Sequence, residues 1–254
     1  MGNTVTSNIK QAICSKSFLA GVFSFAFLVF ISSFENILKE FETKGLLPTE
    51  FHGKIIIDAM SSDTMILAIP IICALPYTAS FVDDIKSGFL KSYISRTTKR
   101  EYITGKLAGC ILSGGLVLML GILLSYAVSA LIFIPMEAAL AEGEISSRCH
   151  IEIFGSALLA FFSGSLWSLA GFTVASLTMN KYMAYASPFI FYYILIILKE
   201  RYFYDMYVIY PKEWLNPSDF WVMGSFGVIL LLCAVMYVLC LVFRITAERR
   251  FKDG

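Results

Sequence analysis

The sequence predicts an all-α, polytopic membrane protein with six transmembrane helices and with both termini in the cytoplasm. Two observations predict this fold. Hydrophobic residues make up 57% of the chain and charged residues 15%, whereas a soluble domain is about 45–50% apolar and about 25% charged. The charged residues are also segregated, which leaves six uncharged stretches near the length of about 20 residues that crosses a hydrocarbon core. The predicted spans are residues 17–36, 64–82, 107–134, 153–178, 182–198 and 221–243, in a single transmembrane domain that occupies residues 1–254.

The distribution of Lys and Arg predicts the orientation of the spans. The N-terminus, the loop 83–106, the turn at Lys181 and the tail after Arg244 together contain 13 of the 20 basic residues but only five of the 19 acidic residues. The loops on the other side contain the remaining seven basic and 14 acidic residues. Because Lys and Arg are enriched in cytoplasmic loops, both termini and the loop 83–106 are expected to lie inside.

The first residues are expected to form a separate amphipathic helix. Val5, Ile9 and Ile13 are spaced at i, i+4 and i+8 within residues 4–16, and this spacing places them on one face of a helix. Such a helix would be interfacial, lying at the inner membrane surface before the first span.

The second span and two outside segments have patterns of their own. Pro70 and Pro76 fall within the second span and are expected to kink it. Residues 35–63 are expected to form an outside loop. Residues 199–221 contain eight aromatic residues, which predicts either an aromatic belt at the headgroup level or a short hairpin that returns into the membrane.

Small residues recur on one face of the third span and, more briefly, of the fourth. The series at i+4 spacing are Gly105, Gly109, Ser113, Val117, Gly121, Ser125 and Ser129, and then Ser156, Ala160, Gly164 and Ser168. Such faces let helix backbones approach closely in lipid, either within one chain or between two subunits. The candidate residues for packing or for a dimer interface are Gly109, Ser113, Gly121, Ser125 and Gly164.

The sequence lacks the motifs that catalysis or a nucleotide-driven motor would need. The two histidines, His52 and His150, fall in separate predicted outside loops, and there is no HExxH or GxxxxGK[ST] motif. Within their uncharged stretches the predicted spans contain no Asp, Glu, Lys, Arg or His. Ion-coupled pumps need such groups within the membrane, so this absence argues against ion-coupled transport. We therefore expect no enzyme activity, no catalytic residue and no bound metal or cofactor, and any energy for transport must come from another polypeptide.

The predicted cytoplasmic loop 83–106 contains a short amphipathic segment. Asp83 and Asp84 occur where acidic residues complement a helix N-terminus. Apolar residues then follow at helical spacing, namely Ile85, Phe89, Leu90, Tyr93 and Ile94. Thr98 and Glu101 form a capping-box pattern that predicts the start of the next helix. The amphipathic helix would either rest on anionic headgroups or dock in a groove of a cytoplasmic partner, and the pattern fits both.

The stretch FVDDIKSGFLKSYISRTTKREYITGKLAG, Phe81 to Gly109, resembles the cytoplasmic loop of the permeases of type-2 ABC exporters. The resemblance depends on an acidic pair, a glycine in a short helix, an S-R element and a G-K pair before the third span. These elements correspond to Asp83–Asp84, Gly88, Ser95–Arg96 and Gly105–Lys106. The six spans, the amphipathic entry helix and the segment PKEWLNP, Pro211 to Pro217, are compatible with that family.

The resemblance implies a permease subunit in the bacterial cytoplasmic membrane, in contact with membrane lipids. It would pair with a second copy as a homodimer, or with a close relative, and with two separate cytoplasmic ABC ATPase subunits. ATP and magnesium would bind to those ATPases and not to this chain, and no nucleic acid is expected as a partner. The loop would be a coupling helix, with contacts to the ATPase from Asp84, Ile85, Gly88, Phe89, Leu90, Tyr93 and Ile94.

The resemblance implies export as the function, and the absence of a polar stripe across the spans suits a hydrophobic or amphipathic substrate. A peptide or toxin is the first expectation, and export of a drug or lipid is the alternative. Two other functional classes remain open, namely a membrane-embedded binding or immunity protein that does not transport, and a passive pore.

Overall fold

The computed structural model describes residues 2–42, 46–90, 97–138, 149–221 and 223–253. Within these ranges the regular secondary structure is helical, and the one isolated β-bridge joins Leu47 to Glu137. The α-helices are α1 (Gly2–Ile13), α2 (Lys16–Ser32), α3 (Phe34–Glu42), α4 (Phe51–Met60), α5 (Asp63–Ile72), α6 (Ser80–Lys86), α8 (Lys99–Phe133), α9 (Cys149–Thr178), α10 (Lys181–Arg201) and α11 (Gly224–Asp253). Two short 3-10 helices, η1 (Ile134–Met136) and η2 (Tyr207–Ile209), accompany them. The all-α prediction is confirmed for the part of the chain that the structure describes.

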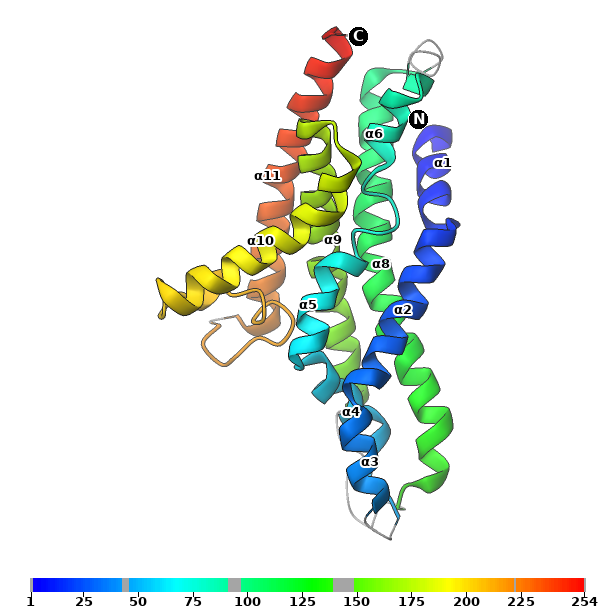
Figure 1. Ribbon diagram of the computed structural model, residues 1–254, viewed down its shortest axis with the longest axis vertical. Helices are drawn as coiled ribbons and strands as arrows, with labels where there is room; N and C mark the ends of the chain where they lie inside the picture. Colours follow the sequence, from blue (N-terminus) through cyan, green and yellow to red (C-terminus); the bar gives the residue numbers. More distant parts are fainter. Residues whose placement is uncertain (1, 43–45, 91–96, 139–148, 222, 254) are drawn as a thin grey trace.

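Helices α8 and α9 form the centre of an elongated bundle (Figure 1). Helices α1, α2 and α4 pack against α8, whereas α10 and α11 pack against α9. Helix α10 leaves the bundle at a marked angle, and α11 then runs back along α9 (Figure 1). The chain therefore has two well-packed central helices and several peripheral helices with large apolar surfaces.

Four helices are long and apolar enough to cross a membrane, namely α8 extended by η1, α9, α10 and α11. Two bent pairs also qualify when each pair is taken as one span. Helices α1 and α2 meet at a bend of 45°, and α4 and α5 meet at a bend of 72°. The described residues thus provide four to six candidate membrane spans.

The second predicted span is interrupted, so the prediction of one kinked helix over residues 64–82 is wrong. Helix α5 tolerates Pro70 but ends at Ile72, turns follow, and α6 begins at Ser80. Pro76 has no N–H with which to continue the helix and disfavours helical backbone at the preceding residue. The last bonds before it tighten accordingly, since Leu75 N–H donates to the carbonyl of Ile72, three residues back.

The predicted outside loop 35–63 contains two helices, α3 and α4. Helix α4 holds the apolar triplet at residues 55–57 and buries Ile55 and Ile56 against the core. It packs on both α8 and α9. The prediction of an outside loop therefore missed the helix that forms a bent pair with α5.

The predicted N-terminal helix is present, but it belongs to the bundle. Its most buried residues are Asn8 and Ala12, whereas Val5, Ile9 and Ile13 are only partly buried. A Cβ atom on Gly105 would lie 2.8 Å from the Asn8 amide, and one on Gly109 would lie 3.3 Å from the Asn8 carbonyl oxygen. The small residues at the start of α8 therefore allow α1 to pack closely on α8. The predicted position of α1 at the membrane surface does not explain this buried face.

The candidate packing residues all lie inside the bundle of one chain. Gly109, Ser113, Gly121, Ser125 and Gly164 are buried. The face of α8 that was predicted from the i+4 series is covered by α1, α2 and α4, as at Gly121, where an added Cβ would lie 2.6 Å from the Phe25 ring. These five residues present no surface to a second copy in this conformation.

The contact between α8 and α9 uses glycines outside that series. A Cβ on Gly114 would lie 2.2 Å from the Ser168 Cβ, and one on Gly115 would lie 2.4 Å from the Ser165 hydroxyl. Gly164 on α9 faces the carbonyl oxygen of Gly114 in turn. Small residues on both helices thus allow the close approach that drives helix association in lipid.

The aromatic segment between α10 and α11 folds back onto the bundle. Trp214 is buried and stacks on Trp167 of α9 with ring centroids 5.7 Å apart. Its indole N–H donates to the carbonyl of Val208 at 2.9 Å, and Lys212 forms an ion pair with Asp63 at 3.0 Å. Trp214 is therefore part of the core and not of an aromatic belt at the surface.

Candidate functional site at the basic end

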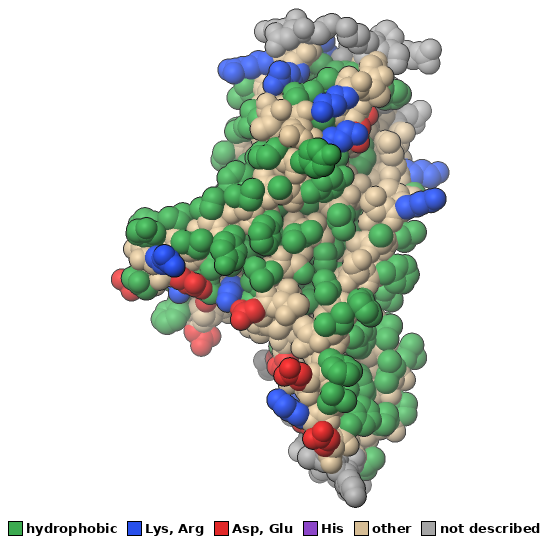
Figure 2. All heavy atoms as spheres, in the orientation of Figure 1, with side chains coloured by type: hydrophobic (Ala, Val, Ile, Leu, Met, Phe, Trp, Pro, Cys, Tyr) green, Lys and Arg blue, Asp and Glu red, His purple; other side chains and the backbone are tan. Residues whose placement is uncertain are grey.

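One end of the bundle collects the segments that were predicted to lie inside. The two chain termini, the end of α6 and the start of α8 lie at the same end (Figure 1). Figure 2 shows Lys and Arg side chains gathered there, with Asp and Glu side chains mainly toward the other end. The turn between α9 and α10 joins them, because Lys181 forms an ion pair with Asp83 and Arg250 donates to the carbonyl of Leu177. We call this region the basic end.

The backbone changes direction at the centre of the predicted coupling helix. Helix α6 ends at Lys86, and Gly88 has φ +73°, a left-handed conformation that favours glycine. A helical turn resumes at Phe89 and Leu90. The prediction of one continuous apolar stripe that starts at Ile85 is therefore wrong, because the break at Gly88 separates Ile85 from the residues that follow.

Asp84 is held in place by a buried network on α8. Its Oδ2 atom lies 2.8 Å from Nζ of Lys106, and the Tyr102 hydroxyl donates to the same oxygen at 2.6 Å. Tyr102 and Lys106 are one helical turn apart on α8, so both side chains reach α6 from one face. The Lys106 side chain is only 2% exposed. Because an unpaired buried charge is strongly destabilising, this network fixes α6 to α8.

A second layer of aromatic and polar contacts surrounds Lys106. Its Nζ lies 4.9 Å from the centroid of the Tyr77 ring, within the range of a cation–π interaction. The Tyr77 hydroxyl donates to Oδ1 of Asn8 at 2.8 Å. The network thus joins α1, the turn after α5, α6 and α8 at a single buried lysine.

The predicted coupling residues have distinct positions around this network. Asp84 is in the ion pair, Ile85 is partly buried, and Gly88 makes the turn. Phe89 is 48% exposed, whereas Leu90 is 9% exposed and belongs to the core. Tyr93 and Ile94 lie outside the described residues. Among the described coupling residues, Phe89 is therefore the one that offers a large apolar surface to a partner.

A cavity of about 580 Å³ opens beside the Asp84–Lys106 pair. Its lining comes from α1, α6, the turn at Gly88, α8 and the start of α10, and it includes both acidic and basic side chains. Phe89 lies on its wall, next to Ser87 and Lys86. The cavity lies beside the segment at Gly88, and Leu90 holds the end of this segment in the core.

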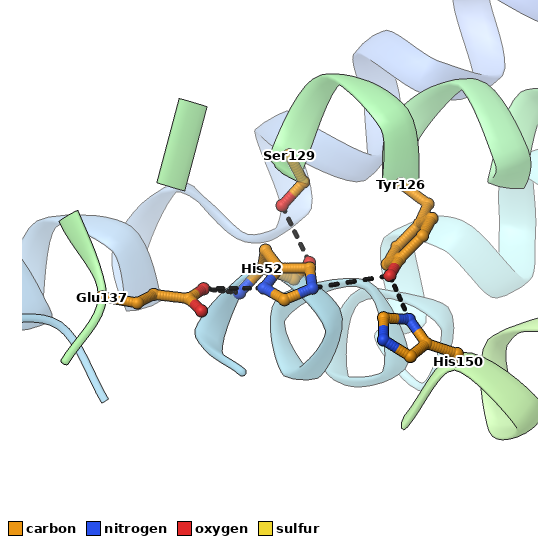
Figure 3. Close-up of polar contacts among 5 residues, drawn as sticks. All are labelled: His52, Tyr126, Ser129, Glu137 and His150. Carbon is orange, nitrogen blue, oxygen red and sulfur yellow. Dashed lines mark hydrogen bonds and ion pairs between the residues drawn. The ribbon is translucent and has the colours of Figure 1, made fainter. Parts of the chain in front are cut away.

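A second polar cluster, drawn in Figure 3, involves the start of α4, which lies at the end of the bundle away from the chain termini (Figure 1). Glu137 Oε1 accepts the His52 backbone N–H at 2.7 Å and contacts Nδ1 of the same residue at 2.8 Å. The Tyr126 hydroxyl lies between the two imidazoles, 3.5 Å from Nε2 of His52 and in contact with Nδ1 of His150. The Ser129 hydroxyl donates to the His52 carbonyl at 2.8 Å. Together these contacts tie α4 to α8 and to the start of α9.

The structure thus brings together two histidines that the sequence placed in separate loops. Their arrangement is a chain of hydrogen-bonded groups, and within the described ranges no three His, Cys, Asp or Glu side chains are placed to hold a metal ion. The hydrogen bonds of Tyr126 to the imidazoles and of Glu137 to His52 fit a role in fixing these ends of the helices to one another. Sequence reasoning missed the cluster because His52 is close to Tyr126 and His150 only once α4 docks on α8.

A comparison with models of known protein families finds no match for this chain, and a comparison with curated protein sequences finds none either. The fold itself defines the class. Several long apolar helices packed around α8 and α9 make the chain a multi-pass α-helical membrane protein.

Proposed function

We propose that this chain is the transmembrane subunit of an ATP-driven exporter of the type-2 ABC class. In this proposal each bent helix pair counts as one span, which gives six spans with both termini in the cytoplasm of a bacterial cell. Two ATPase subunits that bind ATP and magnesium dock at the basic end, and a second copy of the chain completes the substrate path. The gathering of Lys and Arg at the basic end supports this orientation.

The observation that carries the proposal is the anchoring of α6 by the Asp84–Lys106 pair. A permease without a nucleotide-binding motif must receive force through contacts with its motor. The segment at Gly88 and Phe89 projects an apolar side chain beyond a helix that is locked to α8 by a buried ion pair. A displacement of this segment is therefore passed to α8, which runs for 35 residues through the centre of the bundle.

The proposed substrate is hydrophobic or amphipathic, with a peptide or toxin as the first candidate and a drug or lipid as the alternative. The helices that would enclose the path are apolar, and the buried polar clusters lie near their ends. An apolar path favours a substrate that partitions from the membrane over a hydrated ion.

The test is isolation of the tagged chain from its native membrane, followed by identification of bound ATPase subunits and assay of substrate-stimulated ATP hydrolysis. Phe89→Ala should weaken ATPase binding by at least about fivefold, because truncating a central interface aromatic commonly costs more than about 1 kcal/mol. Phe23→Ala is the matched control, since Phe23 is 63% exposed on α2, away from the basic end. It should leave ATPase binding unchanged.

Two outcomes would count against the proposal in different ways. Undiminished ATPase binding by the Phe89→Ala variant would remove the coupling role of this side chain. If the unmodified chain carries no ATPase at all, the exporter proposal fails, and a membrane binding or immunity protein becomes the better explanation.

A further inference from the structure

A groove between α8 and α11 at the basic end is distinct from the Asp84–Lys106 site. It has a volume of about 490 Å³ and is formed by side chains from these two helices. The lining residues are Lys99, Arg100, Ile103, Thr104, Leu107, Cys240, Leu241, Arg244 and Glu248. The contact between the rings of Tyr102 and Phe251, with centroids 6.0 Å apart, brings the two helices together near the chain terminus.

The polarity of the groove changes along its length. On α8 the basic residues Lys99 and Arg100 come first, and Ile103 and Leu107 follow one and two turns further into the bundle. On α11 the order is reversed because the helix runs the other way, so Leu241 precedes Arg244 and Glu248. From Lys99 to Leu107 the rise is about 12 Å at 1.5 Å per residue. Charge is therefore concentrated at the terminus and apolar surface toward the middle of the helices.

The charges in the groove favour an anion. Three basic side chains line it against one acidic side chain. Glu248 is engaged by Arg244, whose Nε donates to Oε1 at 3.0 Å. That bond uses one of the five N–H donors of a guanidinium, a group whose planar fork matches a phosphate.

We propose that this groove binds an anionic phospholipid, with the phosphate near Lys99, Arg100 and Arg244 and one acyl chain along Ile103, Leu107 and Leu241. A soluble anion would match the basic residues but would leave the apolar walls without a ligand. A zwitterionic lipid would match the walls but not the net positive charge. Basic pockets between membrane helices are a recognised setting for anionic headgroups. This inference does not depend on the proposed transport function.

The test uses the purified full-length chain in detergent, titrated with phosphatidylglycerol or with phosphatidylcholine of the same acyl chains and followed by native mass spectrometry. The unmodified chain should bind phosphatidylglycerol more tightly. The triple variant Lys99→Gln, Arg100→Gln and Arg244→Gln should lose about 100-fold in affinity for this lipid, because each of the three basic residues contributes roughly a fivefold factor near an anionic lipid.

The matched control is the triple variant Lys10→Gln, Lys16→Gln and Arg249→Gln, which removes the same charge from exposed positions outside the groove. It should keep its affinity for phosphatidylglycerol. Leu107→Trp, which fills the apolar wall without changing charge, should also weaken binding, and melting temperatures without added lipid confirm that each variant is folded.

Several results would overturn the proposal. Equal binding of the two lipids, or equal losses in the groove and control variants, would indicate a general attraction to charge. Displacement of the lipid by glycerol 3-phosphate at similar concentration would indicate a soluble anion site. A groove variant that keeps lipid binding but loses a protein partner would assign the surface to that partner.

Discussion

Breaking the Asp84–Lys106 pair should destabilise the fold most when Asp84 is removed and the buried lysine loses its partner. Asp84→Ala would leave an ammonium group whose side chain is 2% exposed, with aromatic rings but no carboxylate at ion-pair distance in this network. Removing one partner of a buried pair typically costs about 3–5 kcal/mol. Because Asp84 is 16% exposed and water can reach its side of the pair, we expect a loss near the lower limit, about 3 kcal/mol.

Removal of Lys106 should reduce the stability of the fold less than removal of Asp84. Lys106→Met keeps most of the side-chain volume and leaves a carboxylate that still accepts the Tyr102 hydroxyl. The expected loss is about 1.5–2 kcal/mol, the lower part of the cost of about 1.5–3 kcal/mol for a lost hydrogen bond to a charged group. The double variant Asp84→Ala and Lys106→Met contains neither charge and should be close to Lys106→Met alone. The interaction energy from the cycle should then equal the cost of Asp84→Ala alone, about 3 kcal/mol.

The assay is reversible unfolding in mixed micelles titrated with dodecyl sulfate, followed by tryptophan fluorescence or circular dichroism. Lys181→Ala is the control, because it breaks the neighbouring ion pair with Asp83, in which both side chains are about half exposed, at 49% and 47%. This variant should have little measurable effect on stability. If Asp84→Ala were no worse than Lys181→Ala, or if the double variant were additive, the buried pair would not be the anchor of α6.

Three further predictions follow from the packing and from the two ends of the bundle. Gly121→Leu should destabilise the chain by about 1–3 kcal/mol through overpacking against Phe25, whereas Gly155→Leu, with no atom within 4 Å of an added Cβ, should be tolerated; equal melting temperatures would contradict this. In a background without native cysteines, Glu42→Cys should react with an impermeant thiol reagent in intact cells and Glu248→Cys only after the cells are opened, and the opposite pattern would reverse the proposed orientation. Glu137→Ala should cost about 1.5–3 kcal/mol, because its carboxylate contacts both the backbone N–H and the imidazole of His52; Glu35→Ala, at an exposed position, is the control, and similar stabilities of the two variants would rule out a structural role for the cluster.

The helical fold and the two ends of the molecule could be predicted from the sequence because the membrane imposes both. Backbone N–H and C=O groups in hydrocarbon must form hydrogen bonds within the helix. Uncharged stretches of sufficient length therefore predict helices directly. The capping box also predicted a local feature correctly, since the Thr98 hydroxyl accepts the N–H of Glu101 and α8 begins at Lys99. These signals depend on neighbouring residues alone.

Features that depend on tertiary contacts were not predictable from the sequence. Pro76 signals a disturbance, but whether a helix kinks or breaks depends on what packs beside it. Asp84 and Lys106 were both recognised as elements of the loop motif, yet their contact joins positions 22 residues apart and requires the relative placement of α6 and α8. Helix α4 was missed because His52 and Lys54 give its segment the composition of a loop.

The spacing of the two polar clusters along α8 matches the thickness of a membrane. Lys106 contributes to the cluster at the basic end, and Tyr126 contributes to the cluster at the other end. Twenty residues separate them, a rise of about 30 Å in an α-helix, and the hydrocarbon core of a bilayer is also about 30 Å thick. The residues between them are uncharged, so both clusters lie where water or headgroups can stabilise polar side chains. This spacing favours α8 as a complete crossing of the bilayer over a re-entrant helix.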